Sequence, residues 1–300
     1  MTKTRKGRSI MKLFRQIIVV SICIWGLLSF SEPVHASGSK TETVTYKIRY
    51  QGKTYSKKAL VYVPANYDKQ KQYDVLYFLH GSGDSATGFY ENSHYKQVLD
   101  KLAKQGKLQN TLVVFPTFYP SQAFVTGDYQ KDDKLSRFFA RTELMGALIP
   151  KVEAKYSTYA KSTTKKELQQ TRAHRAIGGF SMGAITSWYV FEEQLPYFKT
   201  FVTLGGDSWV IQEDGGGTAT KQTAKKLAQT PKKYPDLDFK ILAGAGSRDP
   251  AAELLQKQIR EMKKYRGFND TDLKYYELPG AHHTLEATVT LFEHYAKQIF

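Results

Sequence analysis

The sequence predicts an α/β fold, in which helices cover both faces of a mainly parallel central sheet. One observation is a set of short apolar runs, typical of strands buried on both faces, at 75–79, 112–115 and 201–204. Another is that stretches of helical periodicity separate these runs, an alternation that favours parallel strands. The first strands, at 43–50 and 59–63, instead alternate polar and apolar residues and are expected to form an antiparallel hairpin turning at Gln51 and Gly52.

The remaining elements follow the same rhythm along the chain. Further strands are expected at 175–180, 239–242 and 273–277. Helices are expected at 96–104, 138–156, 184–193, 251–264 and 285–300. The polar, aromatic stretches 118–136 and 207–220 read as irregular loops over the carboxyl edge of the sheet, where open α/β sheets bind ligands.

Residues 1–36 have the pattern of a secretory signal peptide. Six basic residues precede or border the apolar stretch 17–30, and the small residues Val34 and Ala36 fit a cleavage site before Ser37. An uncleaved membrane anchor is the alternative, although the apolar stretch is short for a spanning helix. The sequence thus predicts a secreted protein with a linker at 37–41 and one domain at 42–300.

Charge and cysteine content narrow the function classes. The chain has 300 residues and a formal charge of +16; without the six basic residues and one acidic residue of 1–36, the charge is +11. Such a charge favours attraction to an anionic cell wall, or simply keeps the domain soluble. No arginine cluster interleaved with aromatics indicates nucleic acid binding. The single cysteine, Cys23, lies in the expected signal, so neither disulfides nor thiol catalysis is expected after cleavage.

The stretch Gly179-Phe180-Ser181-Met182-Gly183 matches the nucleophile elbow G-x-S-x-G. An expected strand precedes it and an expected helix follows it, as the elbow of an α/β-hydrolase fold requires. The sharp turn would expose the Ser181 hydroxyl and aim the amide of Met182 at a developing oxyanion. Ser181 is therefore the candidate nucleophile, and a glycine-rich strand exit without a catalytic role is the alternative.

A serine nucleophile needs a base, and in this fold the chain order is serine, acid, histidine. Three histidines follow Ser181. His294 falls in the last expected helix and reads as a surface or packing residue, whereas His282 and His283 come just after the last expected strand. Either of these two adjacent histidines could supply the base.

Asp249 is the candidate acid, because it follows the strand expected at 239–242. It would orient the imidazole and stabilise its charged form. It also suits the N-cap of the helix that begins after it. Asp207, which follows an earlier strand, is the rival. Leu79-His80-Gly81-Ser82-Gly83 fits the loop that supplies a second oxyanion donor, with the amide of Ser82 as the candidate and His80 as a structural, hydrogen-bonded histidine.

These residues resemble the esterase D and feruloyl esterase group of α/β-hydrolases, which includes carbohydrate esterase family 1, S-formylglutathione hydrolases and the antigen 85 mycolyltransferases. The resemblance covers roughly 42–300 and rests on 77–81, 175–184 and 280–282. The family's late Gly-x-His pattern falls on Gly280-Ala281-His282, so the resemblance favours His282 over His283 as base. The family's Gly-x-x-Asp pattern falls on 246–249 and ends at Asp249.

The resemblance also implies a substrate class. The run Gly206-Asp207-Ser208-Trp209 looks like a stretch of feruloyl esterase-like members, which would place Trp209 and Asp207 at the acyl pocket. It implies hydrolysis of carbohydrate-linked feruloyl or acetyl esters through an acyl-enzyme, with no metal or cofactor. The aromatic residue that feruloyl esterases often carry after the histidine is missing here. A cell-envelope acyltransferase or esterase of antigen 85 type, or a non-catalytic wall-binding homologue, are the alternatives.

Overall fold

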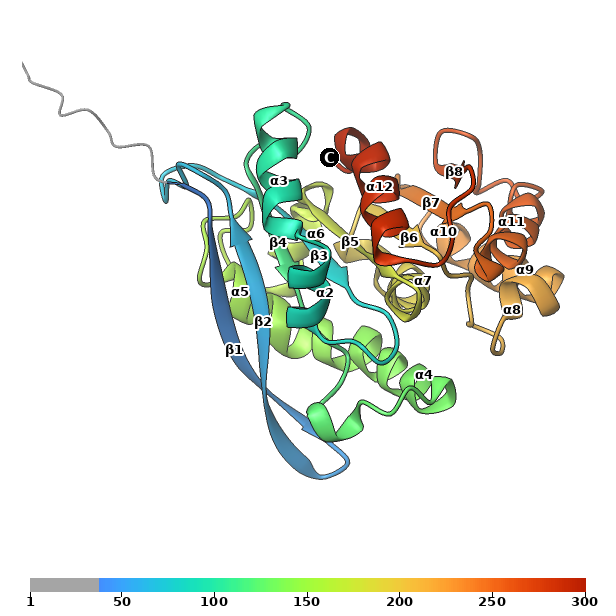
Figure 1. Cartoon of the computed structure of the whole chain (residues 1–300), viewed down its shortest axis with the longest axis horizontal. Helices are drawn as coiled ribbons and strands as arrows, with labels where there is room; N and C mark the ends of the chain where they lie inside the picture. The colour runs from blue at the N-terminus through green and yellow to red at the C-terminus, as the bar shows by residue number, and fades with distance from the viewer. Residues whose placement is uncertain (1–37) are drawn as a thin grey trace, which may run out of the picture. The chain divides into compact units, whose positions relative to one another are not determined.

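A computed structural model describes residues 38–300, and the signal peptide expected at 1–36 lies outside these residues. One sheet holds eight strands in the order β1-β2-β4-β3-β5-β6-β7-β8 (Figure 1). The strands are β1 (Lys40–Tyr50), β2 (Lys53–Val63), β3 (Asp74–Leu79), β4 (Thr111–Phe115), β5 (Arg175–Phe180), β6 (Thr200–Leu204), β7 (Lys240–Gly246) and β8 (Leu273–Leu278). The pairs β1–β2 and β2–β4 are antiparallel and all others are parallel, which confirms the expected α/β-hydrolase architecture.

The hairpin of β1 and β2 turns where the sequence predicts. Gln51 and Gly52 both have positive φ, at 47° and 78°, as a two-residue turn between strongly twisted strands requires. The expected linker at 37–41 is wrong at its end, because Lys40 and Thr41 already pair with β2. Lys40 and Thr41 are both polar, so they do not extend the alternation of polar and apolar residues that predicts the strand at 43–50.

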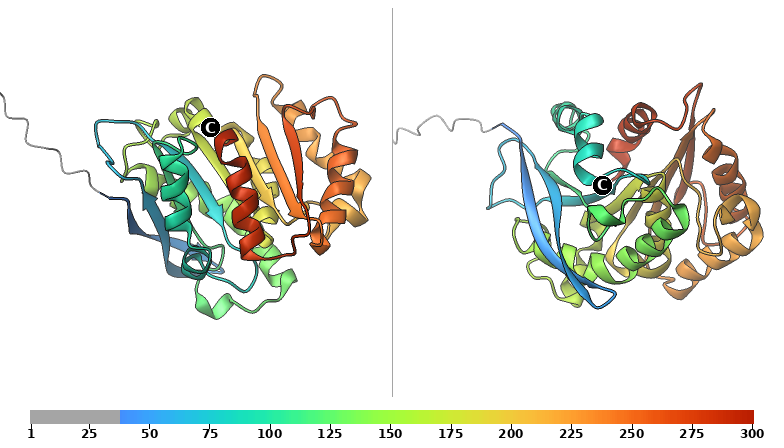
Figure 2. Two further views of the ribbon diagram at one scale, coloured as in Figure 1. Left: turned by 45° about the horizontal axis from the view of Figure 1, so that its top comes forward. Right: turned by 60° about the horizontal axis from the view of Figure 1, so that its bottom comes forward.

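Helices cover both faces of the sheet (Figure 2). One face carries α2 (Ala86–Asn92), α3 (Tyr95–Lys104) and α12 (Leu285–Tyr295). The other carries α4 (Tyr129–Phe138), the π-helix η2 (Phe139–Leu148), α5 (Ile149–Glu153), α7 (Met182–Gln194), α9 (Thr220–Leu227) and α11 (Pro250–Met262). Short helices α6 (Lys165–Gln170), α8 (Gly215–Thr218) and α10 (Gln229–Lys233) lie in the connections.

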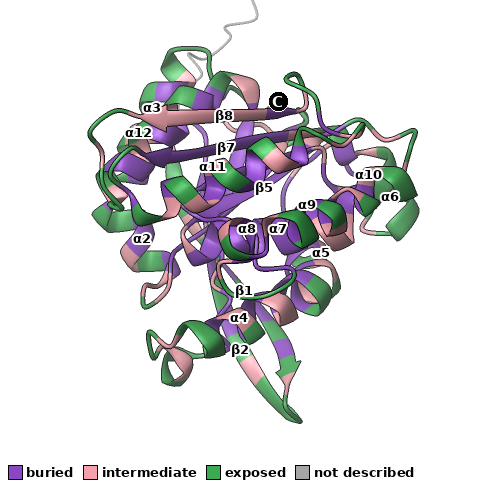
Figure 3. Cartoon of the chain, turned by 90° about the vertical axis from the view of Figure 1, so that its right-hand side faces the viewer, coloured by how far each residue is buried: buried purple, intermediate pink, exposed green. Residues whose placement is uncertain are grey.

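The core consists of two apolar layers, one on each side of the sheet. Strand β3 shows the division, since Leu76 and Phe78 enter one layer while Val75, Tyr77 and Leu79 enter the other. This is the alternation expected along a strand. Strands β4, β5 and β6 are buried throughout, whereas exposed residues lie on the outer helix faces, in the loops and along the hairpin of β1 and β2 (Figure 3).

Two of the expected loops contain helical structure. The stretch 118–136 includes the start of α4, capped by the Asp128 carboxylate, and 207–220 includes α8. Strand β2 begins at Lys53, six residues before the expected start at 59, and the boundaries of the other expected elements agree to within a few residues. Across residues 38–300, no helix is both long and apolar enough to cross a membrane. The loops that follow β3, β5, β6, β7 and β8 meet at the carboxyl edge, where four of the five carry the candidate triad and oxyanion residues.

Candidate active site

Ser181 lies at a strained turn between β5 and α7. Its φ is 54° and its ψ is −117°, a conformation that serine rarely adopts. Its amide donates to the carbonyl of Leu204 at 2.9 Å, which ties the turn to the neighbouring strand. A Cβ on Gly179 would lie 2.6 Å from the Gly183 backbone, and one on Gly183 would lie 2.4 Å from the Leu79 carbonyl. The turn is therefore closed only with glycine at both positions.

Asp249 and His283 form the acid–imidazole pair beside this turn. Asp249 Oδ2 lies 2.8 Å from His283 Nδ1, and the Asp249 side chain is almost fully buried. The other carboxylate oxygen, Oδ1, accepts the amide of Ala251 at 2.8 Å and caps α11. The His283 ring packs on Phe180, with ring centroids 4.5 Å apart. Since Phe180 directly precedes Ser181, this contact places the imidazole next to the elbow.

The expected pairing of Asp249 with His282 is wrong. His282 and His283 are both exposed, but it is the Nδ1 of His283 that reaches the carboxylate. The His282 carbonyl accepts the amide of Thr284 at 3.0 Å. The reason lies in the loop after β8, where the Ala281 carbonyl accepts the Arg248 amide at 2.8 Å. This bond holds Ala281 next to the loop that carries Asp249. With Ala281 in this position, the imidazole that reaches the Asp249 carboxylate is that of His283, the second of the two histidines.

Asp207 does not orient an imidazole. Its Oδ2 accepts the Gly216 amide at 2.7 Å and its Oδ1 accepts Trp209 Nε1 at 3.2 Å, so both oxygens stabilise the loop after β6. Burial, with a smaller contribution from the charge of Asp214, raises the pKa of Asp207 to about 6. The expected role of Asp207 as a substrate contact thus gives way to a role in shaping the loop that holds Trp209.

Trp209 is only 5% exposed and is held by its backbone. Its carbonyl accepts from Arg137 at 2.5 Å and from the Tyr189 hydroxyl at 3.2 Å. The Tyr129 ring lies edge-on to the indole, with centroids 6.4 Å apart, and is 56% exposed. Ile211, two residues further on, is 43% exposed. The loop after β6 and the start of α4 therefore present aromatic and apolar groups to solvent.

The two expected oxyanion donors come from loops that approach each other. Met182 is the first residue of α7, so its amide is among the four that a helix leaves without an internal acceptor. Ser82 follows Gly81, whose Cα is so close to the elbow that an added Cβ would lie 3.2 Å from Ser181 Cβ. Both backbone segments thus border the candidate nucleophile.

His80 is a buried structural histidine, as expected. Its Nδ1 lies 2.7 Å from the Gly81 carbonyl and its Nε2 lies 2.7 Å from the Thr117 hydroxyl. Burial, helped by the nearby charge of Lys57, lowers the pKa of His80 to about 4. The ring is therefore neutral at physiological pH, with Nδ1–H as donor and Nε2 as acceptor.

Comparison with known proteins shows the family of this chain. The model of the family described as "Putative esterase" matches residues 55–294, which is most of the chain. The chain belongs to this esterase family. Endo-1,4-beta-xylanase Y of Acetivibrio thermocellus is 32% identical over 228 residues, which cover 75% of the chain and 20% of the relative. The chain thus spans about a fifth of the length of the curated relatives it matches.

Solved structures show the same fold. A mutant of the feruloyl esterase module from Clostridium thermocellum, complexed with sinapinate, is 29% identical, with a TM-score of 0.72 over 87% of this chain and 88% of that chain. A CE1 ferulic acid esterase from Anaeromyces mucronatus, in complex with ferulic acid, is 21% identical, with a TM-score of 0.62 over 90% and 93% of the two chains. The latter likeness supports the fold alone.

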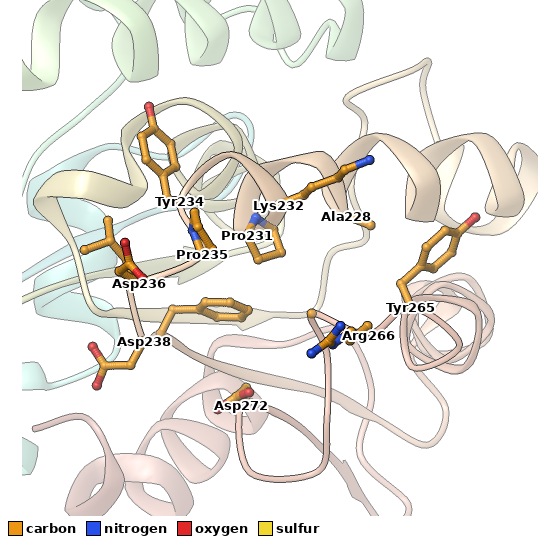
Figure 4. Close-up of a pocket in the computed structure, with 13 residues that line it drawn as sticks. Ala228, Pro231, Lys232, Tyr234, Pro235, Asp236, Asp238, Tyr265, Arg266 and Asp272 are labelled. Carbon is orange, nitrogen blue, oxygen red and sulfur yellow. The ribbon is translucent and has the colours of Figure 1, made fainter.

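A separate pocket of about 900 Å³ lies at the opposite edge of the sheet (Figure 4). Its lining includes Tyr234, Asp238, Tyr265 and Arg266, which precede the first residues of β7 and β8. The candidate active site follows the last residues of the same strands, so the two sites are distinct. Within residues 38–300, no group of three or more His, Cys, Asp or Glu side chains could hold a metal ion.

Proposed function

We propose that this protein is a carboxylic ester hydrolase that works through an acyl-enzyme on Ser181, with His283 as base and Asp249 as its partner. The observation that carries the proposal is the Asp249–His283 pair packed against the residue that precedes a strained serine. Strained residues of this kind are maintained where they serve function. His283 thus replaces His282, which the Gly-x-His pattern favours, as the proposed base.

The proposed reaction has two steps. Because Asp249 holds the proton on His283 Nδ1, Nε2 is the basic nitrogen and accepts the Ser181 proton as Oγ attacks the ester carbonyl. The amides of Met182 and Ser82 bind the resulting oxyanion. The intermediate then breaks its C–O bond, and the leaving alcohol takes the proton from Nε2. Water repeats the sequence on the acyl-enzyme, releasing the carboxylic acid and restoring the serine.

We propose hydroxycinnamoyl or acetyl groups on plant-wall polysaccharide as the substrate class. Support comes from the relatives' printed names, a xylanase and a feruloyl esterase module with bound sinapinate. The exposed ring of Tyr129 beside Trp209 also suits an aromatic acyl group or a sugar face, since both stack on aromatic side chains.

The test compares the wild type with Ser181→Ala on p-nitrophenyl acetate, methyl ferulate and acetylated xylan. We expect hydrolysis by the wild type, loss of hydrolysis in the variant, and labelling of Ser181 by a fluorophosphonate probe. A wild type that neither labels nor cleaves any ester would refute the enzymatic proposal. Hydrolysis of p-nitrophenyl acetate with neither methyl ferulate nor xylan cleaved would refute only the substrate class, and preferential transfer to an added alcohol would instead indicate an acyltransferase.

We further propose that the protein is secreted after cleavage before Ser37. Support comes from the basic start, the apolar stretch 17–30 and the small residues at the expected cleavage site. N-terminal sequencing of protein recovered from the culture medium tests this. A first residue of Ser37 is expected, whereas full-length protein in the membrane fraction would indicate an anchor.

A further inference from the structure

The peptide unit between Gly81 and Ser82 is held from its carbonyl side by His80. The Gly81 carbonyl and the Ser82 amide belong to one planar group, so fixing one fixes the direction of the other. His80 Nδ1–H donates to that carbonyl over 2.7 Å. The Ser82 N–H, which would bind the oxyanion, therefore cannot rotate without breaking this bond.

The Ser82 side chain and the next peptide unit are held by Asp132 and Tyr119. The Ser82 hydroxyl donates to Asp132 Oδ2, and the Tyr119 hydroxyl donates to the same oxygen over 2.8 Å. The Tyr119 oxygen also accepts the Gly83 amide at 2.9 Å. Three successive loop residues, Gly81, Ser82 and Gly83, are thus each bonded to a buried side chain.

A buried ion pair is connected to His80 through Thr117. The Thr117 hydroxyl donates to His80 Nε2, and the Thr117 carbonyl accepts from Lys57 Nζ at 2.7 Å. Lys57 pairs with Glu143 at 2.5 Å, and neither side chain is more than 1% exposed. Buried pairs of this kind contribute little net stability, because desolvation offsets the attraction. The position of this one, connected to the loop through two further residues, points to a role in holding that loop.

Asp132 has the same unusual character. It is fully buried, and its Oδ1 has no hydrogen-bond partner among the described residues. Burial raises the pKa of Asp132, with Asp128 adding to the rise. An unsatisfied buried oxygen destabilises a fold, because it loses its hydration without gaining a hydrogen bond. Stability alone therefore gives no reason for a carboxyl group here.

We propose that Asp132, acting through Ser82 Oγ and Tyr119, is a positioning residue that fixes the aim of the Ser82 N–H at the oxyanion. This inference rests on the proposed function. An oxyanion donor contributes most when it is already oriented, because it then needs no reorganisation as charge develops. We call the hydrogen bonds that Asp132 and Tyr119 make with each other, with Ser82 and with Gly83 the Asp132 clamp. Breaking bonds of this clamp should weaken binding of the transition state while leaving binding of the substrate nearly unchanged.

The experiment uses two variants that leave the Ser82 amide in place. Ser82→Ala removes the hydroxyl that donates to Asp132, and Tyr119→Phe removes the hydroxyl that binds both Asp132 and the Gly83 amide. The matched control is Tyr73→Phe, since the Tyr73 hydroxyl likewise is buried and accepts a loop amide, that of Asp68, at 2.8 Å. Tyr73 precedes β3 and so lies at the edge of the sheet opposite the active site.

We expect the two clamp variants to lower kcat about tenfold or more, since complete loss of an oxyanion donor costs about 10²–10³-fold. KM should change little, and Tm should fall no more than in Tyr73→Phe, whose kcat should stay near wild type. Affinity for a trifluoromethyl ketone, whose serine adduct carries an oxyanion, should fall in parallel with kcat, whereas affinity for the carboxylate product should not.

Asp132 itself gives the rescue test. Asp132→Asn retains an oxygen that can accept both hydroxyl bonds and should keep most of kcat, whereas Asp132→Leu should lose it. If the wild type hydrolyses esters but the clamp variants match Tyr73→Phe in kcat and in ketone affinity, the inference is wrong and the proposed function stands. If the wild type hydrolyses no ester, the proposed function fails, and the inference fails with it.

Discussion

Asp249 uses its two carboxylate oxygens for two different tasks, one toward Ala251 and one toward His283. Oδ1 accepts the first-turn amide of α11 at 2.8 Å, and Oδ2 holds the imidazole Nδ1 at the same distance. The helix cap and the acid role, which are alternatives when only the sequence is considered, therefore coexist in one side chain. The cap also fixes the carboxylate, so the orientation of the imidazole depends on α11.

The pairing predicts that the two adjacent histidines differ sharply in importance. His283→Ala should lower kcat by at least about 10⁴-fold, because loss of the base removes the proton acceptor for Ser181. His282→Ala, the matched control one residue away, should stay close to wild type. Steady-state hydrolysis of p-nitrophenyl acetate measures both. Equal losses in the two variants, or a greater loss in His282→Ala, would contradict the pairing.

The shared carboxylate predicts that activity and stability can be separated at Asp249. In Asp249→Asn the amide oxygen can still cap α11, but the side-chain NH₂ faces His283 Nδ1 and moves the proton to Nε2. We expect kcat to fall about 10⁴-fold with little change in stability. Asp249→Ala should be as inactive and should also lose about 1 kcal/mol of unfolding free energy, as a missing cap does. Urea denaturation and kcat, measured on both variants, check the separation.

The main features of the fold could be predicted because strong local patterns specify them. The buried runs of β3, β4 and β6 and the periodic helices α7 and α11 were all expected from composition and period. The linker end at Lys40 and the helices α2, α6, α8, α9 and α10 were missed. Each of these helices has at most eight residues, which is too short for a hydrophobic period to stand out in the sequence.

The candidate site could be predicted only to the level of its loops. Ser181 and Asp249 were identified because strand ends and a strained turn have sequence signatures. The choice between His282 and His283 depends on the Ala281–Arg248 backbone bond, a contact between distant segments that no local pattern reveals. Asp132 and Lys57 were missed for the same reason, since their partners lie 50 and 86 residues away in the chain.

The backbone of Ser181 predicts a difference between glycine and alanine at this position. With φ at 54°, alanine keeps the strain while glycine relieves it, so Ser181→Gly should unfold with about 1 kcal/mol more free energy than Ser181→Ala. The control is Ser187, inside α7, where glycine should instead be about 1 kcal/mol less stable than alanine. Denaturant titration of the four variants gives the signs. The same order at both positions would show that the turn is not strained.

The neutral, buried His80 predicts a loss of stability in mild acid. Its pKa is lowered from 6.5 to about 4 in the folded protein, so between these pH values the unfolded chain binds more protons. The contribution of neutral His80 to the free energy of unfolding is complete above pH 6.5. It decreases as the pH falls from 6.5 to about 4, by about 3 kcal/mol in total. Asp207, whose pKa is raised to about 6, titrates with the opposite sign, so a variant comparison is needed.

The suitable variant is His80→Asn, because the asparagine amide can replace Nδ1–H as donor to Gly81 but does not titrate. Its unfolding free energy, from urea denaturation between pH 7 and pH 4, should fall less steeply than that of the wild type. The control is His94→Asn, because His94 is exposed and has a φ of 51°, which asparagine tolerates. Its unfolding free energy should fall with pH as steeply as that of the wild type. If His80→Asn shows the same pH dependence as wild type, His80 is not the group that protonates on unfolding, and its neutral form does not hold the loop.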